Sequence, residues 1–196
     1  MKLWIIILFL ILLGLIAWQL WFVLFVNLQE PAYRVLQKKD GYEIRQYDSY
    51  IIAHVSFAGS YKEVASKGFK VLANYIFGGN KQNIRMPMTA PVFVEKKVKL
   101  DGYDIAFVIP SSYKKETLPT PKDDRIEIVE KQSAKIAVYR FTWYPSAKQV
   151  EKKKKEFVEL LRRDGIQPRS DIILARYNPP FILPFLMRNE LMVVVE

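Results

Sequence analysis

The sequence predicts an α+β protein: a curved antiparallel sheet with two helices on one face, preceded by a transmembrane helix. Two observations lead to this prediction. Residues 3–26 form a single long run of uncharged, mostly apolar side chains. Residues 33–196 contain the order strand, helix, strand, strand twice, at a nearly constant offset. We therefore divide the chain into an anchor at residues 1–27, a linker at 28–32 and one domain at 33–196.

The apolar run at residues 3–26 is long enough to cross a bilayer. A helix of this length spans roughly 36 Å at about 1.5 Å per residue, and the hydrocarbon core is about 30 Å thick. A cleaved signal peptide would have an apolar region of about 7–15 residues, followed by small residues at the cleavage site. The bulky Trp18 and Trp21 stand where those small residues would be needed. We expect an uncleaved single-pass membrane anchor, with aromatic residues at the interface.

The charges of the chain bear on its orientation and its partners. Lys2 precedes the apolar run, whereas Arg34, Lys38 and Lys39 follow it. The positive-inside rule therefore favours a cytoplasmic C-terminal domain. The net charge of +10 favours attraction to an anionic membrane surface. Nucleic-acid binding would need a groove-entering motif or aromatic residues among the basic ones. The run Lys152–Lys155 lies on a predicted helix instead, where it forms a solvated face, so we expect no nucleic-acid partner.

The domain is predicted to open with a hairpin and then a strand that leads into the first helix. Residues 33–47 form the hairpin, with Asp40-Gly41 as its turn. Residues 51–57 alternate in the way that a half-buried strand does. Ser60 and Glu63 then have the spacing of a capping box, and apolar residues recur after them at helical intervals.

The second half of the domain repeats this pattern. Ser146 caps a second predicted helix 86 residues after Ser60. At the same offset, residues 137–143 match the strand before the first helix, and residues 189–195 match residues 103–109. Strands of one copy are expected to pair with those of the other, with the helices on the apolar face. The seam between two such halves is a favoured place for a ligand.

Two prolines interrupt residues 83–96, where Ile84, Met86 and Met88 otherwise alternate with other side chains. Proline has no N–H to donate to a sheet ladder, so this stretch is expected to form an edge strand or a bulged strand at the seam. Such a strand would leave the sheet open and provide a groove. Met86 and Met88, on one face with Ile84, would line or floor that groove.

Three motifs resemble those of a known family. Residues 42–47 read YEIRQY, residues 86–92 read MPMTAPV, and a closing block contains YNPP at 177–180 and RNE at 188–190. In this order they resemble the SOUL heme-binding family over residues 33–196. The resemblance implies a distorted antiparallel β-barrel with two helices, and binding of heme or a related tetrapyrrole without an enzymatic reaction. The N-terminal anchor is extra to the soluble members of the family.

The candidate ligand contacts follow from the chemistry of heme. Its iron is usually held by His, Cys, Met or Tyr, and the chain has one histidine and no cysteine, which excludes bis-histidine ligation within one monomer. His54, opposite the apolar strand face, is either an axial metal ligand or a half-exposed surface imidazole. Met86 and Met88 either contact the porphyrin or fill the core. Arg85 and Arg176 are candidates to pair with propionates.

Motifs of common enzyme classes are missing from the sequence. It has no G-x-S-x-G elbow, no H-E-x-x-H and no P-loop glycine pattern. We therefore predict a non-catalytic protein that binds a tetrapyrrole in an apolar groove between two repeats. Two alternatives remain: a small-molecule effector-binding or partner-interaction domain that uses the same groove without heme, and a membrane scaffold that binds no ligand.

Overall fold

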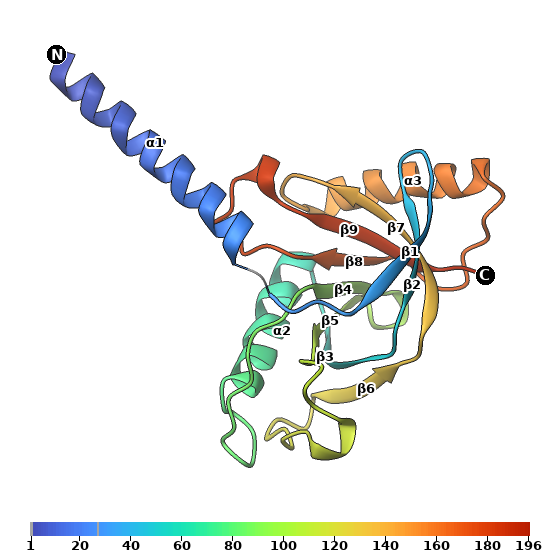
Figure 1. The fold of residues 1–196 in the computed structure, drawn as a ribbon. Coiled ribbons are helices and arrows are strands. Elements are labelled where there is room, and N and C mark those ends of the chain that lie inside the picture. The colour runs from blue at the N-terminus through green and yellow to red at the C-terminus, as the bar shows by residue number, and fades with distance from the viewer. Residues whose placement is uncertain (1, 27) are drawn as a thin grey trace.

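The computed structural model describes residues 2–26 and 28–196, so the two outermost residues of the predicted anchor, 1 and 27, lie outside the described part of the chain. The helices are α1 (Lys2–Phe25), α2 (Tyr61–Ile76) and α3 (Ala147–Arg163). The strands are β1 (Tyr33–Lys38), β2 (Glu43–Tyr47), β3 (Tyr50–Ala58), β4 (Val92–Lys97), β5 (Gly102–Val108), β6 (Glu127–Lys131), β7 (Ala134–Phe141), β8 (Ile173–Arg176) and β9 (Asn189–Val194). α1 extends away from the rest of the molecule (Figure 1).

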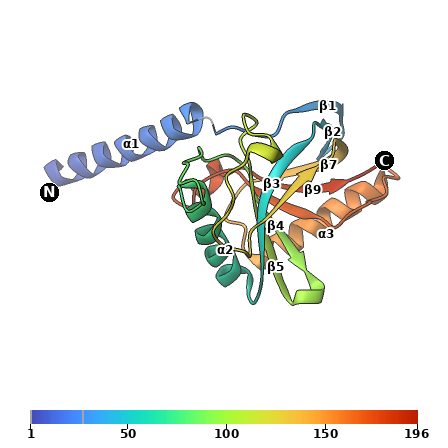
Figure 2. The same ribbon diagram turned by 90° about the horizontal axis from the view of Figure 1, so that it is seen from below.

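All nine strands belong to one antiparallel sheet in the order β1-β2-β7-β9-β8-β4-β5-β3-β6. The sheet curls into a half-barrel (Figures 1 and 2). The unit β3-α2-β4-β5 and the unit β7-α3-β8-β9 have the same element order, and β4 pairs with β8 where the units meet. The predicted α+β fold, a curved antiparallel sheet with two helices, is confirmed.

Local sequence signals explain where these elements begin. The backbone N–H of Ser60 donates to the Glu63 carboxylate at 3.2 Å, and Ser146 Oγ accepts from the Gln149 N–H at 3.3 Å. Both pairs satisfy N–H groups that a helix start leaves without an intrahelical partner. The hairpin of β1 and β2 turns at Gly41, whose φ of 94° is a conformation that glycine adopts readily.

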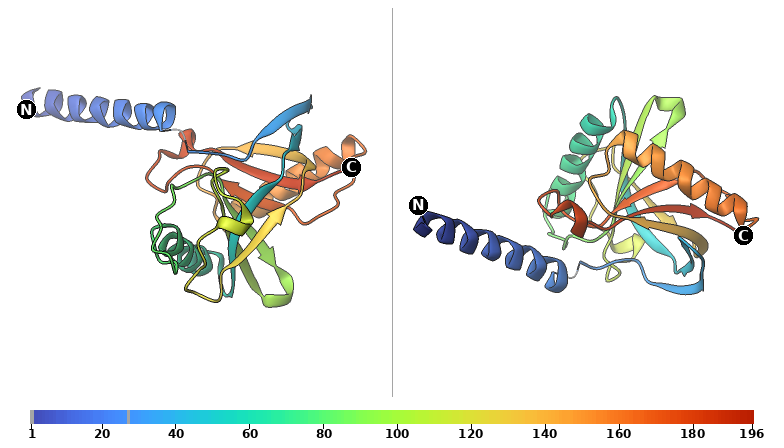
Figure 3. Two further views of the ribbon diagram at one scale, coloured as in Figure 1. Left: turned by 60° about the horizontal axis from the view of Figure 1, so that its bottom comes forward. Right: turned by 90° about the horizontal axis from the view of Figure 1, so that it is seen from above.

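Both helices cover the same face of the sheet, with α2 and α3 in green and orange in Figure 3. Val64 and Leu72 of α2 are buried there in the same core as Ile105 of β5. The Phe157 ring of α3 is buried too and stacks on Tyr139 of β7, with ring centroids 5.6 Å apart. Gly68 allows α2 to approach closely, because a β-carbon at this position would lie 2.6 Å from Ile105 Cγ1. We call this side of the sheet the helix face and the opposite, concave side the inner face.

The stretch with two prolines corrects one prediction. β4 begins only at Val92, after both prolines, and it pairs with β5 on one side and β8 on the other. It is therefore a central strand, and the expectation of an edge or bulged strand was wrong. The residues before it use other bonds: Thr89 Oγ1 donates to the Val108 carbonyl, and the Ala90 N–H donates to the Gln29 carbonyl at 2.9 Å. The prolines thus stand outside the ladder, while the strand lies at the predicted seam.

Candidate functional site

An apolar groove of about 570 Å³ lies on the helix face beside α2. It is walled by α2, by the chain around the start of β4, and by the segment that follows β8. Apolar side chains dominate its lining: Leu28, Ala65, Phe69, Phe77, Met88, Val92, Val94, Ile105, Pro179 and Pro180. The groove therefore runs along the seam where β4 meets β8.

Two aromatic residues of the α2 region face this groove instead of the core. Phe69 lies on α2 and Phe77 directly follows it, and both rings are strongly exposed although they are large and apolar. Phe69 contacts buried Phe107 edge-on, with ring centroids 5.1 Å apart. A contiguous exposed apolar surface of this kind marks an interaction site in a folded protein.

The polar side chains that line the groove are all basic or neutral. Lys62 and Lys70 come from α2, and Arg176 comes from the end of β8. The Tyr61 hydroxyl is buried beside Arg176. No group in the described part of the chain is placed to form a well-aligned hydrogen bond with it. Burial raises the pKa of the Tyr61 phenol, and the nearby Arg176 opposes that shift. The groove thus offers an unsatisfied hydroxyl and a positive rim to a ligand.

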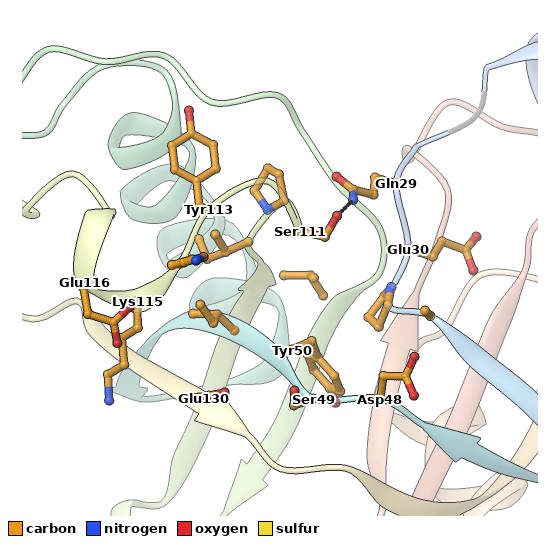
Figure 4. A pocket seen from close by; sticks show the side chains of 17 residues that line it. Gln29, Glu30, Asp48, Ser49, Tyr50, Ser111, Tyr113, Lys115, Glu116 and Glu130 are labelled. Carbon is orange, nitrogen blue, oxygen red and sulfur yellow. Dashed lines mark hydrogen bonds between the residues drawn. The ribbon is translucent and has the colours of Figure 1, made fainter.

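A second pocket of about 510 Å³ has a different character (Figure 4). It lies between residues 29–32, the β2–β3 turn and the loop after β5, and Gln29 donates a hydrogen bond to Ser111 across it. Charged side chains of both signs line it: Glu30, Asp48, Lys114, Lys115, Glu116 and Glu130. This pocket does not match a large apolar ligand, so the groove is the stronger candidate site.

Behind the groove, on the inner face, lies a buried network of charged and polar side chains. Arg45 of β2 donates to both carboxylate oxygens of Glu190 of β9, at 3.1 and 3.3 Å. Arg188 Nε donates to the same carboxylate at 3.0 Å, and the Tyr177 hydroxyl donates to it at 2.8 Å. Glu190 is 0% exposed. One buried carboxylate therefore joins β2, near the start of the domain, to β9, its last strand.

This network also holds a wall of the groove. Tyr177 lines the groove, while its hydroxyl reaches Glu190 and its ring lies 3.6 Å below the Arg188 guanidinium. Arg188 in turn donates to Glu30 at 2.8 Å. Burial and the Glu190 carboxylate both raise the pKa of the Tyr177 phenol, so the hydroxyl keeps its proton and remains a donor.

A family model described as SOUL heme-binding protein matches residues 28–194. The chain belongs to the SOUL heme-binding protein family. A relative, heme-binding protein 1 of Sus scrofa, is 28% identical over 188 residues, which covers 87% of this chain and 95% of that protein.

Solved structures of low sequence identity share the fold. The C-terminal domain of EcmrR matches with a TM-score of 0.61 at 9% identity, covering 84% of this chain and 98% of that one. A hydrolase from Listeria innocua matches with a TM-score of 0.52 at 9% identity, covering 88% and 95%. These two likenesses concern the fold alone.

The SOUL motifs have different positions relative to the groove. Met88 and Arg176, both predicted ligand contacts, line it. Met86 is buried in the core and does not line it, and its backbone N–H donates to the Ile76 carbonyl at 2.7 Å. Arg85 is exposed and does not line the groove, although its backbone forms an isolated β-bridge with Phe77, which does. The structure thus brings together two of the five residues predicted for this SOUL site.

His54 lies on the inner face, away from the residues that line the groove. Its Nδ1 is 2.8 Å from Asp104 Oδ1, which also accepts from Ser56 Oγ at 2.7 Å, and its Nε2 is 3.7 Å from Glu127. The hydrogen bond to Asp104 raises the pKa of His54. No group of three or more His, Cys, Asp or Glu residues in the described part of the chain is arranged to hold a metal ion. Iron ligation by His54 stays a prediction.

The sequence interpretation missed the role of Arg45 and Glu190. The available signal was Glu190, a charged residue that shares its face of β9 with Met192 and Val194. A charge at such a position needs a buried partner, but the sequence does not say which of the many opposite charges supplies it.

Proposed function

We propose that this chain is a membrane-anchored SOUL protein that binds heme or a related tetrapyrrole in the apolar groove, without catalysing a reaction. The observation that carries the proposal is the composition of the groove: an apolar lining of about 570 Å³ with basic side chains at its edge. This volume lies within the roughly 300–1,000 Å³ of small-molecule pockets. Family membership and the Sus scrofa relative support the same ligand class.

Burial of the macrocycle is the main source of affinity. A tetrapyrrole presents two flat apolar faces, and covering several hundred Å² at about 25 cal/mol per Å² gives a large favourable free energy. Phe69 and Phe77 supply aromatic surface, and Met88 supplies a polarisable thioether that packs well on aromatic planes. No side chain that forms a strong iron bond is required for this part of the binding.

Basic side chains at the edge of the groove suit the carboxylates of a natural tetrapyrrole. Arg176, Lys62 and Lys70 can form charge-assisted hydrogen bonds with propionate groups. The same positive edge disfavours cationic ligands, which narrows the alternative of a small-molecule effector to neutral or anionic compounds.

The groove provides few side chains of the types that bind heme iron. Met88 and Tyr61 line it, whereas the Tyr177 hydroxyl is engaged with Glu190. The raised pKa keeps the Tyr61 phenol protonated at neutral pH, which makes it a weak ligand but leaves it a hydrogen-bond donor. A bound heme would bring its own redox and ligand chemistry. We propose that axial ligation contributes little to binding.

A titration of the full-length protein in detergent tests this proposal. We expect hemin and metal-free protoporphyrin to bind with similar affinities, seen as shifts of their Soret bands. Phe69→Ala is expected to lower the affinities for both compounds about tenfold, because it removes part of the apolar wall of the groove. Val98→Ala, a change at an exposed apolar residue outside the groove, is the matched control.

The outcomes of this titration are separable. If neither compound binds at micromolar concentration, the proposed function is wrong. If only hemin binds and His54→Ala abolishes its binding, the ligand site belongs to the inner face. Unchanged affinity in Phe69→Ala, with a normally folded variant, would remove the groove from the proposal.

The anchor is the second part of the proposal. α1 contains an apolar span at Trp4–Trp21, and nearly all of this helix lies outside the protein core. We propose that it stays in the membrane and places the domain on the cytoplasmic side. Resistance to alkaline carbonate extraction, with an intact N-terminus by mass spectrometry, is the expected result. Because the chain has no cysteine, a single Val98→Cys label then reports which side of the membrane the domain occupies.

A further inference from the structure

The segment between β8 and β9 carries an uncharged apolar loop. Residues 179–187 read PPFILPFLM and contain no acidic or basic side chain, although the protein as a whole is highly charged. Phe181 and Phe185 are 51% and 60% exposed in this loop. Exposed phenylalanines without neighbouring charges on a loop are unfavourable in water and favourable at an apolar surface.

A second uncharged loop is bonded to the first. Residues 141–147 read FTWYPSA, and the Trp143 N–H donates to the Pro184 carbonyl at 2.8 Å. Trp143 is 53% exposed and Tyr144 is also exposed. Asn189 Nδ2 donates to the Trp143 carbonyl at 2.8 Å, which fixes this loop to β9. We refer to Trp143, Tyr144, Phe181 and Phe185 together as the aromatic edge.

The aromatic edge lies against α1 through a polar residue inside the apolar span. Gln19 Nε2 donates to the Phe181 carbonyl, and the Leu183 N–H donates to Gln19 Oε1, both at 3.2 Å. The Trp18 and Phe181 rings are stacked, with centroids 6.0 Å apart. Figure 1 shows the loop before β9 beside the last turns of α1. Gln19, which is strongly polar, therefore has both ends of its amide satisfied by this loop.

These contacts determine the depth of the loop if α1 lies in a bilayer. Gln19 belongs to the apolar span Trp4–Trp21 and precedes the end of α1 at Phe25 by six residues. At about 1.5 Å per residue, it lies roughly 9 Å along the helix from that end. A loop bonded to Gln19 is then level with the outer part of the membrane, where aromatic side chains are favoured and charged ones are costly.

We propose that the aromatic edge inserts into the lipid bilayer beside α1 and forms a second membrane contact of the domain. This inference rests on the proposed anchoring by α1. The groove shares Leu28 with the chain that leaves α1, and Pro179 and Pro180 with the segment that begins the loop. Insertion therefore holds the groove next to the membrane surface, where an apolar ligand can exchange with the lipid phase.

A single-cysteine label tests the insertion in the full-length protein. An environment-sensitive dye is attached to Phe185→Cys, and the protein is placed in lipid nanodiscs. Val98→Cys with the same dye is the control, because Val98 is 82% exposed. It lies on the β4–β5 hairpin, which is away from α1 in every view (Figures 1–3). We expect a blue-shifted emission at position 185 and quenching by nitroxide lipids labelled near the head group. The dye at position 98 is expected to respond as in water and to be quenched by iodide.

A second readout avoids any change to the aromatic edge. The chain has four tryptophans, so replacing Trp4, Trp18 and Trp21 by Phe leaves Trp143 as the sole indole. We expect its fluorescence in lipids brominated near the head group to be at most about half of its fluorescence in the same lipids without bromine.

The results separate this inference from the anchor itself. If carbonate extraction leaves the protein in the membrane but both reporters behave as in water, the aromatic edge does not insert and the inference is overturned. If carbonate releases the protein, the anchor fails and the inference fails with it. Shielding that changes with the protein-to-lipid ratio would identify a second copy of the chain as the occupant and would also overturn the inference.

Discussion

On the helix face, apolar side chains such as Leu72, Phe157 and Ile105 fill the space between helices and sheet. On the inner face, apolar residues surround a network in which Glu190 is bonded to Arg45 and Arg188. The two faces are thus buried by different interactions. Apolar contacts are non-directional, so a gap between them can be left open for a ligand at a moderate loss of burial.

A charged network does not tolerate such a gap. A buried charge without its partner destabilises a protein by about 3–5 kcal/mol, so every member of the network must be present and correctly placed. This difference explains why the groove opens on the helix face, while the inner face holds Tyr177 and the wall of that groove in place. We expect changes on the inner face to affect folding, and changes in the groove to affect binding.

The largest expected effect comes from breaking the network. Glu190→Ala removes the carboxylate that buried Arg45 shares with half-buried Arg188. Arg45 keeps Glu43 and Arg188 keeps Glu30, so we expect a loss of about 3 kcal/mol in the free energy of unfolding, the lower end of the cost of breaking a buried ion pair. Glu159→Ala is the matched control, because its pair with Arg162 lies on the surface of α3 and contributes under about 1 kcal/mol. Urea unfolding of both variants measures the difference, and equal stabilities would contradict the contrast between the faces.

The close contact of α2 with the sheet gives the next largest effect. In an exposed helix, Gly→Ala stabilises by about 1 kcal/mol. For Gly68→Ala we expect the opposite sign, a loss of about 1–3 kcal/mol, because the new methyl group meets Ile105. Ser66→Ala, two residues away in α2, is expected to change the free energy of unfolding by under about 0.5 kcal/mol. A more stable Gly68→Ala would show that α2 can move away from β5 without loss.

A smaller effect is expected from the basic edge of the groove. Arg176→Gln removes one charge near the proposed carboxylates, so we expect affinity for protoporphyrin to fall about two- to fivefold. Affinity for the dimethyl ester of the same compound is expected to stay unchanged, and Arg140→Gln, an exposed arginine of β7, serves as control. Equal losses for the acid and the ester would mean that Arg176 acts through packing.

The smallest effect concerns the single histidine. The hydrogen bond to Asp104 raises the pKa of His54 above its ordinary value of about 6.5, and the Glu127 carboxylate adds to this while Lys131 opposes it. A group with a raised folded-state pKa stabilises fully below its unfolded pKa and loses that contribution as pH rises through the folded pKa. We therefore expect stability to fall slightly above about pH 6.5.

A pH series of thermal unfolding for wild type and His54→Asn measures this contribution. The difference between the two proteins should shrink as pH rises. A difference that grows with pH would mean that the neutral imidazole, not the imidazolium, is the form held by Asp104.

Much of the fold could be predicted because it depends on local signals. The caps at Ser60 and Ser146 and the turn at Gly41 depend on residues only a few positions apart. The 86-residue offset is a repeated pattern that can be read directly along the chain. The apolar span of α1 is likewise a property of consecutive side chains. Met88 was predicted as a ligand contact from its place in the MPMTAPV motif, and Arg176 from its charge in the closing block.

Other features depend on which distant residues the curved sheet brings together. Arg45 and Glu190 are 145 positions apart in the chain, and only the pairing of β2, β7 and β9 makes them partners. The proline stretch looked like an edge strand, yet the ladder begins after it and runs through the centre of the sheet. The sequence by itself determined the elements and the anchor-like helix, because these follow from neighbouring side chains. The tertiary structure alone decided which charges are paired, which aromatic residues line the groove and which loops meet α1, because burial and long-range contacts arise only after the sheet has curled.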